Sequence, residues 1–159
     1  MMLVTTSRKP GQLTRSIARA LSQILGGRFE NRGKSGFEEM AAIAERHGLS
    51  RILFVWEKNG NPDRLVFFDL EKAAELGEDD NADKNPWLKP ELQVSGVVFP
   101  RVPFRKQGCT LKTEGPDGLK IGKLFLASEG ENQMVISGKT LKAYNEKRLI
   151  LELRIRPIS

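Results

Sequence analysis

The residues of this sequence that could do chemistry are mostly cations, and they gather near the N-terminus. Four of them surround one proline and one glycine in residues 5–21, TTSRKPGQLTRSIARAL: Arg8, Lys9, Arg15 and Arg19. Cations at the beginning of a helix oppose the helix macrodipole, so the fold alone does not require them there. Guanidinium groups and the free N–H groups of a first helical turn both bind phosphate. The stretch therefore predicts an anion-binding site, with Ser7 in the same turn.

Two elements are expected to position these cations. Residues 2–6 are apolar and β-branched, which predicts a strand. Residues 13–24 place apolar side chains at helical spacing, and Gly26 can end that helix in a left-handed conformation. Ligands of α/β sheets commonly bind outside the carboxyl ends of strands, so we expect the turn between the two elements to lie in such a crevice. The alternative is that the arginines pair with the acidic middle of the chain.

Charge is distributed unevenly along the chain, whose formal net charge is +6 and whose pI is about 9.6. Residues 1–36 hold seven Lys/Arg and one acid, residues 37–83 hold five and twelve, and residues 84–159 hold fourteen and seven. Two basic segments around an acidic one predict a polyanion-binding surface built from both ends of the chain, although basic side chains can also serve solubility alone. The candidate RNA-binding residues are Ser7, Arg8, Lys9, Arg15, Arg19, Arg28, Arg32, Lys34, Arg101, Arg105, Lys106, Arg154 and Arg156.

A glycine-rich basic loop over residues 26–35, GGRFENRGKS, offers a second chemistry. Gly33-Lys34-Ser35 resembles the end of a phosphate-binding P-loop, but five residues rather than four separate Gly27 from Gly33, and a helix precedes the loop. The structural interpretation is a capping box, in which Ser35 and Glu38 begin a second helix.

Nothing else in the sequence forms a catalytic constellation. Cys109 is the one cysteine and His47 the one histidine. These counts exclude an intramolecular disulfide and the usual zinc sites, and neither residue lies in a recognisable catalytic motif. We expect no metal, no cofactor and no enzymatic activity. The chain has no long apolar run, so we expect a cytoplasmic protein without membrane contact. Phe29, Trp87 and Phe104 lie in basic or proline-rich contexts where they could stack on unpaired bases, and the alternative is that each packs at the edge of the core.

The remaining pattern predicts strands. Two buried strands are expected in RILFVWE and DRLVFFDL, around the turn KNGNP, and residues 77–86 read as a surface connection. Short strands fill the second half, where KLFLAS could be the equivalent of RILFVW, and the last strand, RLILELRIRP, alternates apolar residues with arginines. The predicted fold is α/β, a mixed sheet with flanking helices.

Taken together, these stretches resemble the Brix-domain family of ribosome-biogenesis proteins, in its compact archaeal form. The resemblance rests on TTSRKPGQLTRSIARAL, GGRFENRGKS, FEEMAAIAERHG and RILFVWEKNGNPDRLVFF, and on the final basic strand. It implies a single Brix domain over residues 1–159, with approximate halves 1–83 and 84–159 similar to the anticodon-binding domain of class II aminoacyl-tRNA synthetases. It also implies a non-catalytic factor of rRNA processing or subunit assembly that binds pre-ribosomal RNA.

Two other functions stay open at this stage. The first is a nucleotide- or RNA-acting enzyme that uses the Gly33-Lys34-Ser35 loop. The second is a protein-binding assembly module, whose acidic segment from about Asp69 to Asp83 recruits a basic ribosomal or assembly protein.

Overall fold

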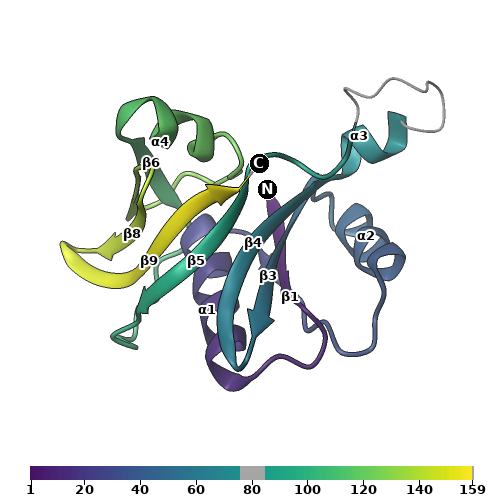
Figure 1. The fold of residues 1–159 in the computed structure, drawn as a ribbon, viewed down its shortest axis with the longest axis horizontal. Coiled ribbons are helices and arrows are strands. Elements are labelled where there is room, and N and C mark those ends of the chain that lie inside the picture. The colour runs from purple at the N-terminus through teal and green to yellow at the C-terminus, as the bar shows by residue number, and fades with distance from the viewer. Residues whose placement is uncertain (76–84, 159) are drawn as a thin grey trace.

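One mixed sheet runs through the computed structural model, which describes residues 1–75 and 85–158. Within those residues nine strands pair in the order β2-β1-β3-β4-β5-β9-β8-β7-β6 (Figure 1). The strands are β1 (Met2–Thr6), β2 (Arg28–Phe29), β3 (Arg51–Lys58), β4 (Asn61–Asp69), β5 (Glu91–Val98), β6 (Cys109–Thr113), β7 (Asn132–Ile136), β8 (Thr140–Asn145) and β9 (Arg148–Ile158). The helices are α1 (Gln12–Leu25), α2 (Phe37–Arg46), α3 (Leu70–Glu75) and α4 (Gly115–Gly122). The predicted mixed sheet with flanking helices is confirmed.

The pairing pattern repeats on the two sides of the sheet. β1 is parallel to β3, and β3, β4 and β5 then continue antiparallel. β6 is likewise parallel to β7, and β7, β8 and β9 continue antiparallel until β9 meets β5. The counterpart of β3 is therefore β7. The expectation that KLFLAS is that strand is wrong, because these residues follow α4, where the Leu124 and Phe125 N–H groups donate to Ile121 and Gly122.

The two faces of the sheet carry different helices. Val4, Leu53 and Phe67 point into a large core that also contains α1 and residues of α4. Their neighbours Leu3 and Phe54 point into a smaller core that contains α2 and the beginning of α3. Because successive side chains of a strand point to opposite faces, α1 and α2 cover opposite faces of the curled sheet (Figure 1).

α1 is the element that ties the two sides of the sheet together. Its apolar face, which includes Ile17 and Leu21, is fully buried and shares one core with Leu53 of β3 and Met134 of β7. The helix ends as predicted at Gly26, whose φ of 68° is left-handed. Its opposite face carries the exposed Arg15 and Arg19, so burial of α1 fixes the place of both guanidinium groups.

α2 begins one residue later than a Ser35 cap would place it. Its N-cap is Gly36, with no side-chain hydrogen bond at the cap, so the predicted capping box of Ser35 and Glu38 is wrong. Instead, the Ser35 N–H donates to the Arg32 carbonyl, and the Ser35 carbonyl accepts the Arg32 Nε–H at 2.7 Å. The loop before α2 is thus organised around Arg32.

Two further sequence expectations concern the middle of the chain. The connection expected over residues 77–86 lies mostly outside the described residues. Among residues 1–75 and 85–158, no helix is both long enough and apolar enough to cross a membrane.

Candidate nucleic-acid interface

A groove lined by cations lies where the β1–α1 turn, the outer face of α1 and the β2–α2 loop meet. We call it the basic groove, and its volume is about 770 Å³. It is lined by Arg8, Lys9, Pro10, Arg15, Arg19, Asn31, Arg32, Gly33 and Lys34. The structure therefore brings together six of the cations predicted from the sequence, and the lining contains no acid.

Local backbone conformation shapes both loops of the basic groove. Lys9 has a φ of 53°, a left-handed conformation that residues other than glycine rarely adopt. Gly33 has the same φ in the facing loop, where glycine adopts it without strain. Each loop thereby changes direction next to the groove. The left-handed conformation of Lys9 costs free energy, which other interactions of the fold must offset.

The charges of the basic groove are not neutralised by acids within the described residues. Cations elsewhere in the described residues do form ion pairs with acids, such as Arg51 with Asp69 at 3.0 Å and Arg64 with Glu91 at 3.0 Å. None of the six groove cations has a carboxylate oxygen within 4.0 Å in residues 1–75 and 85–158. Within this part of the chain, the alternative of pairing with the acidic middle is not met.

Arg32 belongs to the groove wall but is held inside the fold. It is 4% exposed, and its Nη1–H donates to the Thr6 carbonyl at 3.1 Å in addition to the Ser35 bond. Its guanidinium carbon lies 4.9 Å from the Phe37 ring centroid and 5.4 Å from that of Phe54. Burial lowers the pKa of Arg32, and the like charge of Arg8 lowers it further. Arg32 is thus placed to anchor the loop.

Ser7 is also placed in the fold rather than on the groove surface. It is buried, and its hydroxyl accepts the Glu57 N–H at 3.0 Å while its own N–H donates to the Val55 carbonyl. These bonds attach the end of β1 to β3.

The beginning of α1 already holds an anion that belongs to the protein. Glu57 Oε1 accepts the Gly11 N–H and the Thr14 Oγ1–H, both at 2.7 Å. A carboxylate at this position satisfies an otherwise unpaired N–H and interacts favourably with the helix dipole. The N-cap N–H of α1 is therefore not free to bind an external phosphate. Sequence reasoning missed Glu57, because it lies 46 residues from Gly11 and no local pattern marks it.

A second, smaller groove continues the basic surface along α1. Its volume is about 330 Å³, and it is lined by residues of α1, Arg19 among them, and by residues 99–104, which include Arg101. Gln23 Nε2 donates to the Phe104 carbonyl at 2.7 Å and to the Lys106 carbonyl at 3.3 Å, which ties this segment to α1. Arg19 lines both grooves, so the smaller groove adjoins the basic groove and adds Arg101 to the cationic surface.

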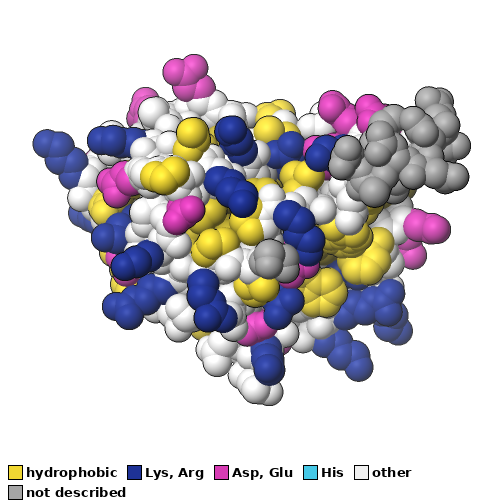
Figure 2. All heavy atoms as spheres, turned by 45° about the horizontal axis from the view of Figure 1, so that its top comes forward, with side chains coloured by type: hydrophobic (Ala, Val, Ile, Leu, Met, Phe, Trp, Pro, Cys, Tyr) yellow, Lys and Arg dark blue, Asp and Glu magenta, His cyan; other side chains and the backbone are white. Residues whose placement is uncertain are grey.

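The other predicted cations are more dispersed. Arg28 pairs with Glu30 at 2.9 Å, Lys106 pairs with Glu131 at 3.1 Å, and Arg105 is exposed beside Lys106. Figure 2 shows that lysine and arginine side chains are spread over the visible face of the molecule, with hydrophobic and acidic side chains between them.

The arginines of the last strand lie on the other face of the sheet. Leu153 and Ile155 point into the large core with α1, so the alternating Arg154 and Arg156 point away from it, as the predicted strand pattern requires. Arg156 also donates a hydrogen bond to the side chain of Gln93. Arg154 and Arg156 do not line the basic groove, so their part in one surface built from both ends of the chain stays a prediction.

The aromatic candidates have different surroundings. Phe29 lies under Arg19, whose guanidinium carbon is 4.9 Å from the ring centroid, and Phe104 packs against the large core. Trp87 packs against the smaller core, 4.8 Å from Phe68 and 5.4 Å from Phe37 between ring centroids.

Catalytic alternatives gain little from the geometry. The Ser35 N–H bonds within its own loop, so it is not free to cradle a phosphate as a P-loop N–H is. Burial raises the pKa of Cys109 to about 11, which keeps this thiol protonated at neutral pH. In the described part of the chain, no three His, Cys, Asp or Glu side chains group in a way that could hold a metal ion.

The acidic segment is described only at its beginning. Asp69 is 7% exposed, pairs with Arg51 and accepts the Lys72 N–H at 3.1 Å. This carboxylate therefore serves the fold, while most of the segment predicted to recruit a protein partner lies outside the described residues.

Comparison with known proteins finds similar archaeal proteins. It is 29% identical to a probable Brix domain-containing ribosomal biogenesis protein of Archaeoglobus fulgidus, with 100% of this chain and 97% of that protein aligned. It is 39% identical to the protein of the same name from Methanothermobacter thermautotrophicus, over 69% of this chain and 68% of that protein. No family model matches the sequence.

Two solved structures share the fold. A probable ribosomal biogenesis protein from Aeropyrum pernix superposes with a TM-score of 0.73 at 24% identity, covering 99% of this chain and 97% of that one. Mil, an archaeal Imp4-like protein, superposes with a TM-score of 0.73 at 22% identity, covering 98% and 97%. At these identities the two structures establish the shared fold.

Proposed function

The chain belongs to the family of Brix domain-containing ribosomal biogenesis proteins, and from this membership we propose that it binds pre-ribosomal RNA as a non-catalytic factor of ribosome biogenesis. The single observation that carries the proposal is the basic groove, whose cations have no acidic partner within the described residues. A cationic groove of this kind attracts a ribose-phosphate backbone through its charge, without reading a base sequence.

The expected salt dependence follows from the number of exposed cations. Arg32 is buried, which leaves five exposed cations in the groove: Arg8, Lys9, Arg15, Arg19 and Lys34. If each neutralises one phosphate, the logarithm of affinity falls with the logarithm of salt concentration with a slope of about −3.5 for single-stranded RNA to about −4.5 for a duplex. A fourfold rise in salt then weakens binding by roughly 130- to 500-fold.

A charge-reversal experiment tests the proposal. Arg15→Glu combined with Arg19→Glu should reduce the steepness of this slope by about 1.4 or more, because two phosphate contacts are lost. Fluorescence anisotropy with labelled rRNA fragments at several salt concentrations measures it. Lys120→Glu with Lys123→Glu is the matched control, since Lys120 on α4 and Lys123 at its C-cap are both exposed outside the groove.

Two outcomes contradict the proposal. If the Arg15 and Arg19 variant has normal circular dichroism and an unchanged slope of log affinity against log salt concentration, the groove is not the RNA-binding site. Turnover of ATP or GTP with magnesium that is lost in Lys34→Ala establishes the enzymatic alternative. Arg154→Glu with Arg156→Glu serves as a third arm, and we expect it to change the slope less than the Arg15 and Arg19 reversal does, because neither side chain lines the basic groove.

The finer architecture is part of the same proposal. We take residues 1–159 as a single domain of two related halves, 1–83 and 84–159, similar to the anticodon-binding domain of class II aminoacyl-tRNA synthetases. The repeated pairing of β1-β3-β4-β5 and β6-β7-β8-β9 supports this division. The proposed setting is the cytoplasm of an archaeal cell, where ribosomal or assembly proteins are further expected partners.

A further inference from the structure

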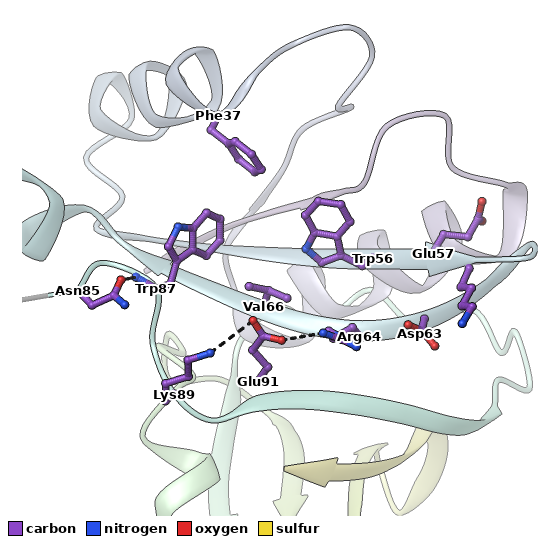
Figure 3. A pocket seen from close by; sticks show the side chains of 11 residues that line it. Phe37, Trp56, Glu57, Asp63, Arg64, Val66, Asn85, Trp87, Lys89 and Glu91 are labelled. Carbon is purple, nitrogen blue, oxygen red and sulfur yellow. Dashed lines mark hydrogen bonds and ion pairs between the residues drawn. The ribbon is translucent and has the colours of Figure 1, made fainter. Parts of the chain in front are cut away.

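An aromatic pocket lies on the α2 face of the sheet, next to the basic groove. Its volume is about 630 Å³, within the range of pockets that bind small ligands. Figure 3 shows Phe37 of α2, Trp56 of β3, Val66 of β4 and Trp87 around it, with charged side chains below. We call this site the aromatic pocket.

The rings of the aromatic pocket are held in place by the fold. Phe37 meets Phe54 and Trp87 edge-on, with centroid distances of 5.3 and 5.4 Å. Trp87 forms an isolated β-bridge with Phe68, and the next residue, Leu88, donates its N–H to the Phe67 carbonyl at 2.9 Å. A pocket formed in advance costs little ordering entropy when a ligand enters.

The aromatic pocket also has features that the fold does not require. Phe37 remains 43% exposed, although a phenylalanine is normally stabilised by full burial. The Trp56 Nε1–H is buried in the pocket wall and has no acceptor among the described residues. Buried donors are nearly always paired, so an unpaired indole N–H in this wall is unusual for a folded protein.

Only one loop separates the aromatic pocket from the basic groove. Arg32 lines the groove and stacks on the ring of Phe37, which lines the pocket. Arg8, across the groove, would lie 3.7 Å from a Cβ added to Gly36, the residue before Phe37. A ligand with its phosphates in the basic groove can therefore place a neighbouring group against Phe37.

We propose that the aromatic pocket takes an unpaired nucleobase of the RNA whose backbone lies in the basic groove. This inference rests on the proposed function and deepens it, because it assigns single-stranded RNA to the site. Aromatic rings stack on unpaired bases, whereas a base inside a duplex is not available to them.

The polar rim favours a base over an apolar side chain of a protein. Arg64 and Glu91 form an ion pair at 3.0 Å beside the pocket, Lys89 approaches Glu91 at 3.7 Å, and Asp63 lies at the same rim (Figure 3). This rim offers donors and acceptors together, as the edge of a base requires. The adjoining cations, which pair with no acid in residues 1–75 and 85–158, give phosphate rather than a peptide a place beside the pocket.

Intrinsic fluorescence can test the proposal directly. The chain has two tryptophans, Trp56 and Trp87, and both line the aromatic pocket. We expect a short oligoadenylate to change their emission, and an abasic ribose-phosphate oligomer of equal length to bind roughly tenfold or more weakly, as the loss of one stacked base predicts. The difference between the two oligomers should disappear in Phe37→Leu, which keeps an apolar side chain but removes the ring.

Leu119→Ala is the matched control, because Leu119 is 52% exposed on α4 and lines neither site. We expect it to preserve the difference between the two oligomers. Thermal melting checks that Phe37→Leu is folded, and the comparison of oligomers on the unsubstituted protein stays decisive if that variant is not.

The outcomes separate this inference from the proposed function. Equal binding of both oligomers by the unsubstituted protein, with binding lost in the Arg15 and Arg19 reversal, refutes the pocket assignment but keeps the groove. Binding of neither oligomer, nor of rRNA fragments, refutes both. A change in tryptophan emission on addition of a leucine- and phenylalanine-containing peptide, but not of RNA, makes the pocket a protein-docking site and overturns the inference.

Discussion

Removal of the Glu57 carboxylate should destabilise the fold at the point where the basic groove begins. Glu57 lies near the end of β3, and its Oε1 accepts both the Gly11 N–H and the Thr14 Oγ1–H at 2.7 Å. These bonds attach the beginning of α1 to the sheet. Because α1 carries Arg15 and Arg19, the same carboxylate helps to position the groove.

The two bonds set the size of the effect. A hydrogen bond to a charged group contributes about 1.5–3 kcal/mol, and water recovers part of this at a partly exposed carboxylate. We therefore expect Glu57→Ala to lower the free energy of unfolding by about 2–3 kcal/mol. For a chain of this length that corresponds to a fall in Tm of about 4–12 °C. Glu57→Gln keeps an acceptor and loses only the charge, so we expect it to cost about 1 kcal/mol.

A double-mutant cycle with Thr14→Val separates the cap from other effects of the substitution. The Thr14 side chain is fully buried, so in the Glu57→Ala background its hydroxyl has lost its acceptor, and valine should cost nothing or even stabilise. Urea unfolding of the four proteins gives the coupling energy, which we expect to exceed about 1 kcal/mol. Effects that add within about 0.5 kcal/mol would refute the assignment of Glu57 as the cap of α1.

Three further predictions concern single residues. Arg32→Lys should lower the Tm by about 4–8 °C, because one ammonium cannot bond the Thr6 and Ser35 carbonyls and also stack on Phe37. Differential scanning calorimetry measures the Tm, and an unchanged value contradicts the anchoring role. The Cys109 thiol should react with a thiol reagent at pH 8 only as fast as the protein unfolds. Because burial raises its pKa to about 11 in the folded state, its contribution to the free energy of unfolding should fall as pH rises from about 9 to 11, and Cys109→Ala should lack this part of the pH dependence. Gly118→Ala should destabilise α4 although alanine favours helices, because its Cβ would lie 2.6 Å from the Ile136 carbonyl oxygen; a raised Tm contradicts that contact.

The parts of the site that were predicted from the sequence are those that local pattern determines. Helical spacing over residues 13–24 places Arg15 and Arg19 one turn apart on the exposed face of α1. A left-handed glycine ends the helix at Gly26. Alternation along β9 predicts that Arg154 and Arg156 share an exposed face. Each of these depends on neighbours within a few residues.

The parts that were not predicted depend on residues far apart in the chain. Arg32 occurs in a polar loop, where an arginine is normally exposed, yet the Thr6 carbonyl and the Phe54 ring, which lie 26 and 22 positions away, bury it. Glu57 looks like an ordinary charged residue near the end of a strand until β3 pairs with β1 and brings it to Gly11. KLFLAS has strand-like composition, but its first residues form turns at the end of α4, and Leu124 and Phe125 are buried in the core from there.

Alternation along a strand also explains why basic ends of a chain need not form one surface. β9 lies beside β5 in the middle of the sheet, so its two sets of side chains face opposite sides of the molecule. The apolar set completes the core under α1, which forces the arginine set to the α2 face, outside the lining of the basic groove. The second half of the chain therefore supports the groove mainly by burying α1, and its strongest effect on RNA binding should be indirect. Large-to-small substitutions of the β7 or β8 residues that share the large core with Ile17 and Leu21 should therefore weaken RNA binding. They remove no cation, but they leave a cavity that allows α1 to shift and displaces Arg15 and Arg19.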